Sequence, residues 1–115
     1  MAQTLTVAAA QLGPSSPSKA QTVERMITLM KAAGQQQVEL LTFPELSLTP
    51  YFATRVRESC DEFLEDSFPP SGTEPLFEAA RQAQLHWLLP YAERENGQVF
   101  NCAVLIDPHG EVVHK

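Results

Sequence analysis

One carboxylate in this chain stands where an α/β protein could use it for chemistry. Glu45 comes directly after an apolar run that starts at Val38, and its neighbours are Phe43, Pro44 and Leu46. An apolar surround favours the protonated form of a carboxyl group, and such a carboxyl can serve as a general base and later as a general acid. The same pattern is also compatible with a plainer role, since a glutamate can cap a helix or pair with a cation.

The cysteine and histidine residues are weaker candidates. Cys102 lies in an apolar run that predicts a strand, so we expect a buried structural thiol rather than a nucleophile. Cys60 has acidic neighbours, which disfavour the thiolate that a nucleophile requires. The histidines fall in different segments, and no Cys or His pair has metal-ligand spacing, so we expect no metal and no cofactor. These histidines are His86, His109 and His114.

The first half of the chain predicts a strand, a helix and a second strand. Residues 5–10 form a short apolar strand, and Ser16 with Pro17 predicts the start of an amphipathic helix that ends at Gly34 as a left-handed cap. Residues 38–43 form the second strand, which Pro44 must end. A strand–helix–strand order indicates a parallel pair, so Glu45 falls at the carboxyl edge, where ligands bind in open α/β sheets.

The second half predicts a further helix and an antiparallel meander. Residues 56–64 are expected to hold a short helix, and Thr73 is expected to cap a helix that runs to about residue 84. Residues 87–92 form a strand, and the Asn96-Gly97 pair predicts a hairpin turn into a return strand at 99–106. A tight turn at 107–110 then leads into residues 111–115, which begin another strand. The fold class is therefore α/β.

Charge and hydropathy exclude several classes of function. The formal net charge is −6, and the eight basic residues form no cluster in the sequence, so we expect neither a nucleic-acid partner nor a membrane surface. The first residues lack the basic start and apolar run of a secretory signal, and no apolar stretch is long enough for a membrane span. With only two cysteines, the chain is expected to be cytoplasmic with reduced thiols.

The motifs along the chain resemble those of the nitrilase superfamily of carbon–nitrogen hydrolases. The resemblance rests on Ala10-Gln11 at the end of the first strand, on Phe43-Pro44-Glu45-Leu46 and on Tyr91-Ala92-Glu93. It continues in Phe100-Asn101-Cys102-Ala103 and in Asp107-Pro108-His109-Gly110. Each motif is short, and their order and spacing carry the resemblance. It implies that residues 1–115 are the N-terminal portion of a single four-layer α-β-β-α sandwich. The unclosed pattern at Val112-Val113 suggests truncation after Lys115.

Within the superfamily, the loop after Glu45 is most similar to N-carbamoyl-D-amino-acid hydrolases. The similar residues are Leu46-Ser47-Leu48-Thr49-Pro50-Tyr51-Phe52, and Pro90 departs from that branch, which has a glycine there. Tyr51 and Phe52 are expected either to line a pocket or to pack beneath the loop. Asn101 is expected to make a structural hydrogen bond near the site.

The resemblance implies hydrolysis by a Glu-Lys-Cys triad, of which this chain contains only Glu45. The thiolate attacks the amide or carbamoyl carbon, the glutamate transfers the proton, and the lysine stabilises the oxyanion. Lys115 corresponds to the residue before the family's Tyr-Arg-Lys segment, not to the catalytic lysine. The implied substrate is a small amide or carbamoyl compound, and the full-length protein is expected to be a homo-oligomer. The alternative is a catalytically incomplete relative that acts as an interaction module or has no activity.

Overall fold

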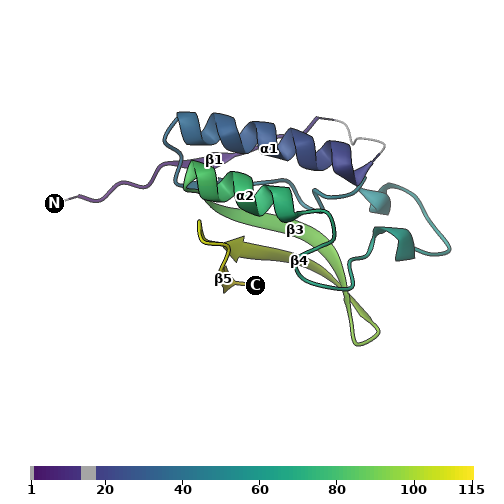
Figure 1. The fold of residues 1–115 in the computed structure, drawn as a ribbon. Helices are drawn as coiled ribbons and strands as arrows, with labels where there is room; N and C mark the ends of the chain where they lie inside the picture. Colours follow the sequence, from purple (N-terminus) through teal and green to yellow (C-terminus); the bar gives the residue numbers. More distant parts are fainter. Residues whose placement is uncertain (1, 14–17) are drawn as a thin grey trace.

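A computed structural model describes residues 2–13 and 18–115 and shows five strands, two α-helices and two 3-10 turns (Figure 1). Strand β1 (Val7–Ala9) is followed by helix α1 (Lys19–Gln35) and strand β2 (Leu40–Thr42). The 3-10 turns η1 (Phe52–Thr54) and η2 (Asp61–Phe63) lie in the long loop before helix α2 (Glu74–Ala83). Strands β3 (His86–Glu95), β4 (Gln98–Ile106) and β5 (Val112–His114) complete the chain.

The strands form a single mixed sheet in the order β1-β2-β3-β4-β5. β1, β2 and β3 are parallel, while β4 and β5 each add antiparallel to the preceding strand. The predicted strand–helix–strand unit is thereby confirmed. The hairpin prediction is also confirmed, because Asn96 and Gly97 connect β3 to β4 with φ angles of 51° and 75°, as a type I′ turn requires.

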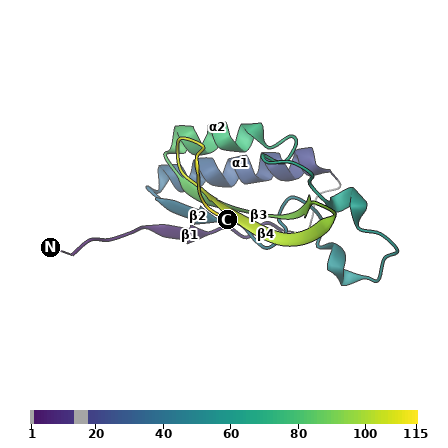
Figure 2. The ribbon, with the colours of Figure 1, turned by 90° about the horizontal axis from the view of Figure 1, so that it is seen from below.

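Both helices pack on the same face of the sheet (Figure 2). The core between the two layers is apolar, and alternate strand residues point into it, as the two-residue period of a strand requires. The α1 stripe of Val23, Met26 and Met30 is buried, so the methionines serve packing. The fully buried strand side chains that meet the helices are Leu41, Trp87, Leu89, Val104 and Ile106.

Helix α1 differs from the prediction at its C-terminal end. Gly34 is helical, and the left-handed residue is Gln37, with φ of 59°. Val38 N–H donates to Ala33 O at 3.0 Å and Gln37 N–H donates to Gly34 O at 3.1 Å, which is a Schellman ending one turn later than expected. Gly34 is needed for another reason, because a Cβ there would lie 2.8 Å from the Cβ of Ala83 on α2.

The other predictions about the helix boundaries agree only in part with the structure. The expected cap Ser16 and Pro17 lie outside the described residues, and the Ser18 hydroxyl caps α1 by accepting from Gln21 N at 3.2 Å. Of the short helix expected within 56–64, only the three-residue 3-10 helix η2 (Asp61–Phe63) forms. Thr73 precedes α2 as predicted, but its hydroxyl donates to Pro70 O at 2.5 Å instead of capping the helix.

Neither helix of the described residues covers the second face of the sheet (Figure 2), and apolar side chains are exposed on that face. Val7 on β1 and Val99 on β4 are 59% and 60% exposed there, in register positions opposite to those that face the helices. A sheet with two apolar faces is typical of the inside of a layered fold. The observed mixed α/β sheet with one helical layer matches the predicted N-terminal part of a nitrilase-type sandwich.

Closing the α1–α2 gap should destabilise the fold. We expect Gly34→Ala to lower the free energy of unfolding by about 1–3 kcal/mol through overpacking against Ala83. In an Ala83→Gly background the same change should be neutral or stabilising by up to about 1 kcal/mol, because alanine favours a helix over glycine. Urea denaturation of the four proteins of this cycle measures the coupling, and additive effects would contradict the contact.

The open apolar face should make residues 1–115 associate in solution, since exposed apolar patches and sheet edges promote pairing. We expect light scattering to show species larger than a monomer. Val7→Lys with Val99→Lys should reduce this association, whereas Gln21→Lys with Thr28→Lys, on the exposed surface of α1, adds equal charge and should not. A monodisperse native monomer would contradict the prediction.

Candidate active site

Glu45 lies just beyond the carboxyl end of β2, as predicted, but its carboxylate is not enclosed by apolar side chains. Phe43 and Leu46 are buried at 4% and 6% exposure and point into the protein, whereas Pro44 and Glu45 are exposed. The apolar flanks therefore anchor the backbone on either side and leave the carboxylate outside. The expectation of an apolar surround for Glu45 was wrong, because the chain turns at Leu46 and leaves Pro44 and Glu45 exposed between two buried residues.

The backbone changes direction immediately after Glu45. Leu46 has a left-handed φ of 51°, which is strained for a residue with a branched side chain. The next residue holds this strained backbone in place, since Ser47 donates twice to Pro90 O of β3, from its N–H at 3.1 Å and from its hydroxyl at 3.2 Å. Left-handed backbone of this kind often accompanies functional sites.

Pro90 fits into β3 without breaking the sheet. Its carbonyl points toward the Ser47 loop, so its nitrogen points the same way, and the ladder to β4 needs no N–H from this residue. Proline, in place of the glycine that the N-carbamoyl-D-amino-acid hydrolase branch has at this position, therefore leaves β3 continuous from His86 to Glu95.

Asn101 is the direct partner of Glu45. Its Nδ2 donates to Glu45 Oε1 at 2.5 Å, across 56 residues of sequence, from the middle of β4. The prediction of a hydrogen bond from Asn101 near the site is confirmed. This contact fixes one carboxylate oxygen and leaves the other oxygen for a ligand or a proton.

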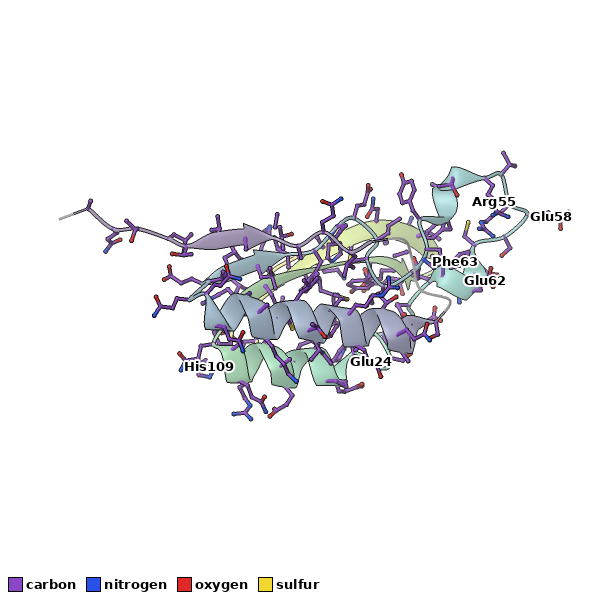
Figure 3. The ribbon with its side chains drawn as sticks, turned by 90° about the horizontal axis from the view of Figure 1, so that it is seen from above. Glu24, Arg55, Glu58, Glu62, Phe63 and His109 are labelled. Carbon is purple, nitrogen blue, oxygen red and sulfur yellow. The ribbon has the colours of Figure 1, made fainter. Side chains whose placement is uncertain are left out.

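A pocket of about 430 Å³ adjoins Glu45. Its walls are the segment 11–13, the first turns of α1 and the loop from Pro44 to Arg57. Tyr51 lines this pocket, whereas Phe52 packs instead against Phe63, with ring centroids 4.9 Å apart. Figure 3 shows Arg55 and Phe63 where this loop extends beyond the end of the sheet. The volume is within the range of small-molecule sites.

The pocket gathers cations that looked scattered in the sequence. Arg25, Arg55 and Arg57 all line it, and Glu45 is the one carboxylate among the described residues that line it. Sequence reasoning missed this grouping because Arg25 is on α1 and the other two are on the loop after Glu45. The spacing Arg55-x-Arg57 beside the candidate carboxylate was the signal that was available.

Cys102 lies on the helix-facing side of β4, in a cluster with Tyr91, Glu93 and Lys115. Glu93 is 7% exposed, accepts from Tyr91 Oη at 3.1 Å and pairs with Lys115 Nζ at 2.6 Å. Burial raises the pKa of the Cys102 thiol, and burial is also the first cause of the raised pKa of Tyr91. The prediction of a structural thiol rather than a nucleophile is consistent with this setting.

None of the remaining candidates is among the described residues that line the pocket beside Glu45. Cys60 is half-buried at the start of η2. All three histidines are exposed, and Figure 3 shows His109 at the opposite end of the molecule from Arg55. Among residues 2–13 and 18–115, no group of three or more His, Cys, Asp or Glu side chains could hold a metal ion.

The amino-acid sequence places the chain in a hydrolase family. The family model for carbon–nitrogen hydrolases matches residues 6–115. The chain therefore belongs to the carbon–nitrogen hydrolase family, within the nitrilase superfamily that its motifs indicated.

Curated relatives and solved structures agree with this assignment. The chain is 28% identical over 121 residues to Nitrilase 3 of an unknown prokaryotic organism, covering 94% of this chain and 36% of that protein. It is 33% identical over 85 residues to a formamidase of Bacillus thuringiensis (strain Al Hakam), covering 72% of this chain and 25% of the formamidase. The chain thus spans about a third or less of the length of these relatives.

Among solved structures, a carbon–nitrogen hydrolase from Helicobacter pylori G27 superimposes with a TM-score of 0.76 at 18% identity, over 96% of this chain and 38% of that one. An amidase from Nesterenkonia sp. gives 0.69 at 21% identity, over 96% of this chain and 41% of that one. These likenesses establish the fold.

Within the part of the chain that the structure describes, no helix is long and apolar enough to cross a membrane.

Cys102 should be protected from alkylation in the folded protein. Because burial raises its pKa, the folded state favours the neutral thiol. The stabilisation that the neutral Cys102 thiol gives the folded protein is complete at pH values below about 8.5, the pKa of an unfolded cysteine. It is lost as pH rises through the pKa of the thiol in the folded state. We expect iodoacetamide to modify Cys102 in a Cys60→Ser variant more slowly in buffer than in urea at pH 8. Equal rates would contradict a buried thiol.

Proposed function

We propose that this chain contributes Glu45 as the general acid/base of an enzyme that hydrolyses a non-peptide carbon–nitrogen bond in an amide or an N-carbamoyl amino acid. The observation that carries the proposal is the hydrogen bond from Asn101 to Glu45, at the carboxyl edge of β2 and beside a pocket of small-molecule size. Membership of the carbon–nitrogen hydrolase family supports the reaction class.

The chemistry assigned to Glu45 is a pair of proton transfers. In the first half of the reaction, the Glu45 carboxylate accepts the proton of the nucleophilic thiol as sulfur bonds to the carbonyl carbon, and it delivers that proton to the departing nitrogen as the carbon–nitrogen bond breaks. In the second half, it accepts a proton from the water that attacks the thioester and returns it to sulfur. The lysine and the cysteine of the triad would come from sequence after Lys115.

Asn101 is proposed to position Glu45 for these transfers. A loop carboxylate can rotate freely, whereas an oxygen bound at 2.5 Å by an amide on β4 cannot. The opposite oxygen is then held in a defined direction, which is what proton transfer to a placed nucleophile requires. Asn101 touches Glu45 and not the reacting atoms, so it is a positioning residue.

The branch with N-carbamoyl-D-amino-acid hydrolase activity is part of this proposal. The choice of this branch is supported by the similarity of residues 46–52 to it. The named relatives are a nitrilase and a formamidase, so they support the family and not the branch. We propose likewise that residues 1–115 are the N-terminal portion of one hydrolase domain. Its full-length form is proposed to be a cytoplasmic homo-oligomer. An interaction module without activity is not favoured, because the named relatives bear the names of enzymes.

Glu45→Gln should abolish most of the hydrolysis by the whole protein. The experiment is to read the gene beyond the codon for Lys115, to express the complete reading frame and to measure ammonia release from N-carbamoyl amino acids, amides and nitriles. We expect kcat/KM to fall by about 10²–10⁴-fold, the usual contribution of general acid–base catalysis. Asn101→Ala should lower kcat with little change in KM.

The matched control is Glu24→Gln, which removes the same charge from an exposed position on α1 and should leave kcat/KM unchanged. Two results would overturn the proposal. One is native activity in the Glu45→Gln protein. The other is ammonia release by residues 1–115 alone, which would show that the triad is not needed. A natural stop directly after Lys115 would favour the alternative without activity.

A further inference from the structure

We propose that the pocket beside Glu45 binds a substrate that carries a carboxylate remote from its scissile carbon–nitrogen bond, with Arg57 as the main carboxylate ligand and Arg55 beside it. The inference rests on the proposed function, because it places the scissile group at Glu45. It adds a specificity determinant on the loop that follows β2, within this chain.

The charge of the pocket is opposite to that of the whole chain. The protein has a formal net charge of −6, with 14 acidic and 8 basic residues. The described residues that line the pocket nevertheless include three arginines and a single carboxylate, which is Glu45 itself. A concave site of positive potential favours anions and disfavours cationic amides. The general acid/base role of Glu45 does not by itself require this excess of positive charge in the pocket.

Arg57 is already held in place before any ligand binds. Its Nε donates to Phe52 O at 3.2 Å, and its guanidinium carbon lies 5.0 Å from the centroid of the Phe63 ring. Phe63 is in turn stacked on Phe52, with an interplanar angle of 3°. The side chain of Arg57 is only 27% exposed, so little of its rotamer freedom is left to lose on binding.

Most of the hydrogen-bonding capacity of Arg57 is still available to a ligand. A guanidinium has five N–H donors, and Phe52 O accepts from one of them. Arg57 Nη1 lies 4.0 Å from Glu62 Oε1, the outer limit of an ion pair, and the Glu62 side chain is 69% exposed, so this contact is weak. The planar fork of an arginine matches the two oxygens of a carboxylate.

Arg55 and Arg25 add to the positive potential in different ways. Arg55 is exposed, lies two residues before Arg57 on extended backbone and makes no ion pair with any residue in the described ranges. Arg25 stands on the α1 wall and has interactions of its own, so the assignment of the carboxylate rests on the two loop arginines. A volume of about 430 Å³ has room for a small acid with an amide or carbamoyl group at its other end.

The test compares each acid with its neutral amide. Binding of N-carbamoylglycine, N-carbamoylglycinamide, succinamate and succinamide to the protein is measured by calorimetry. We expect each anion to bind at least about tenfold more tightly than its neutral partner, with a preference that falls as salt is added. A lead of N-carbamoylglycine over succinamate would identify carbamoyl amino acids as the class, and the reverse would identify dicarboxylic acid monoamides.

Variants of Arg57 separate charge from geometry. Arg57→Gln should remove most of the anion preference, and Arg57→Lys should retain the preference while weakening binding, because a lysine keeps the charge without the fork. The control Arg81→Gln removes a cation from the exposed surface of α2 and should change nothing. Thermal melts of each variant show whether the fold is retained.

The two proposals can fail separately. Equal binding of anions and neutral amides, or an anion preference that survives Arg57→Gln, would overturn the assignment of the carboxylate site and leave the role of Glu45 intact. Anion binding that depends on Arg57, together with hydrolysis by the whole protein that is insensitive to Glu45→Gln, would support the binding site and reject the acid/base role.

Discussion

The long free edge of β3 constrains the rest of this structure. β2 has three residues and pairs with β3 only at His86, Trp87 and Leu88, so the rest of the ten-residue β3 lacks a neighbouring strand on that side. Buried backbone groups need partners, and the loop after β2 supplies them. Ser47 binds Pro90 O, and Glu65 pairs with Ala92 and Arg94. The loop that carries Glu45 and the arginines is therefore laid along β3 by ordinary strand chemistry.

Side-chain contacts also hold the later part of this loop, at Glu65 and Asp66. Arg94 of β3 donates to Asp66, with Nε 2.7 Å from Oδ1, and this hydrogen bond lowers the pKa of the Asp66 carboxyl. Lys19, at the start of α1, pairs with the nearly buried carboxylate of Glu65. A segment with little regular secondary structure is in this way tied to the sheet and to α1 near its C-terminal end.

Local signals made much of the architecture predictable. Proline at position 44 and the Asn96-Gly97 pair act through backbone geometry alone, so β2 ended and the hairpin turned where the sequence indicated. Predictions that depended on tertiary contacts did worse. Gly34 is explained by Ala83, which is 49 residues away, and the three arginines line one pocket because the loop that carries two of them lies beside α1. The exposure of Glu45 likewise follows from the turn at Leu46, which periodicity does not reveal.

The hairpin between β3 and β4 links a turn at the surface to the orientation of Glu45. Because side chains alternate along a strand, Asn101 can meet Glu45 only in the present pairing, in which it lies opposite Ala92. A slip of one residue would turn Asn101 toward the helices and bring Phe100 or Cys102 to the other face. The left-handed turn at Asn96-Gly97 fixes that register. Two residues remote from the pocket thus determine whether the carboxylate meets an amide, an aromatic ring or a thiol.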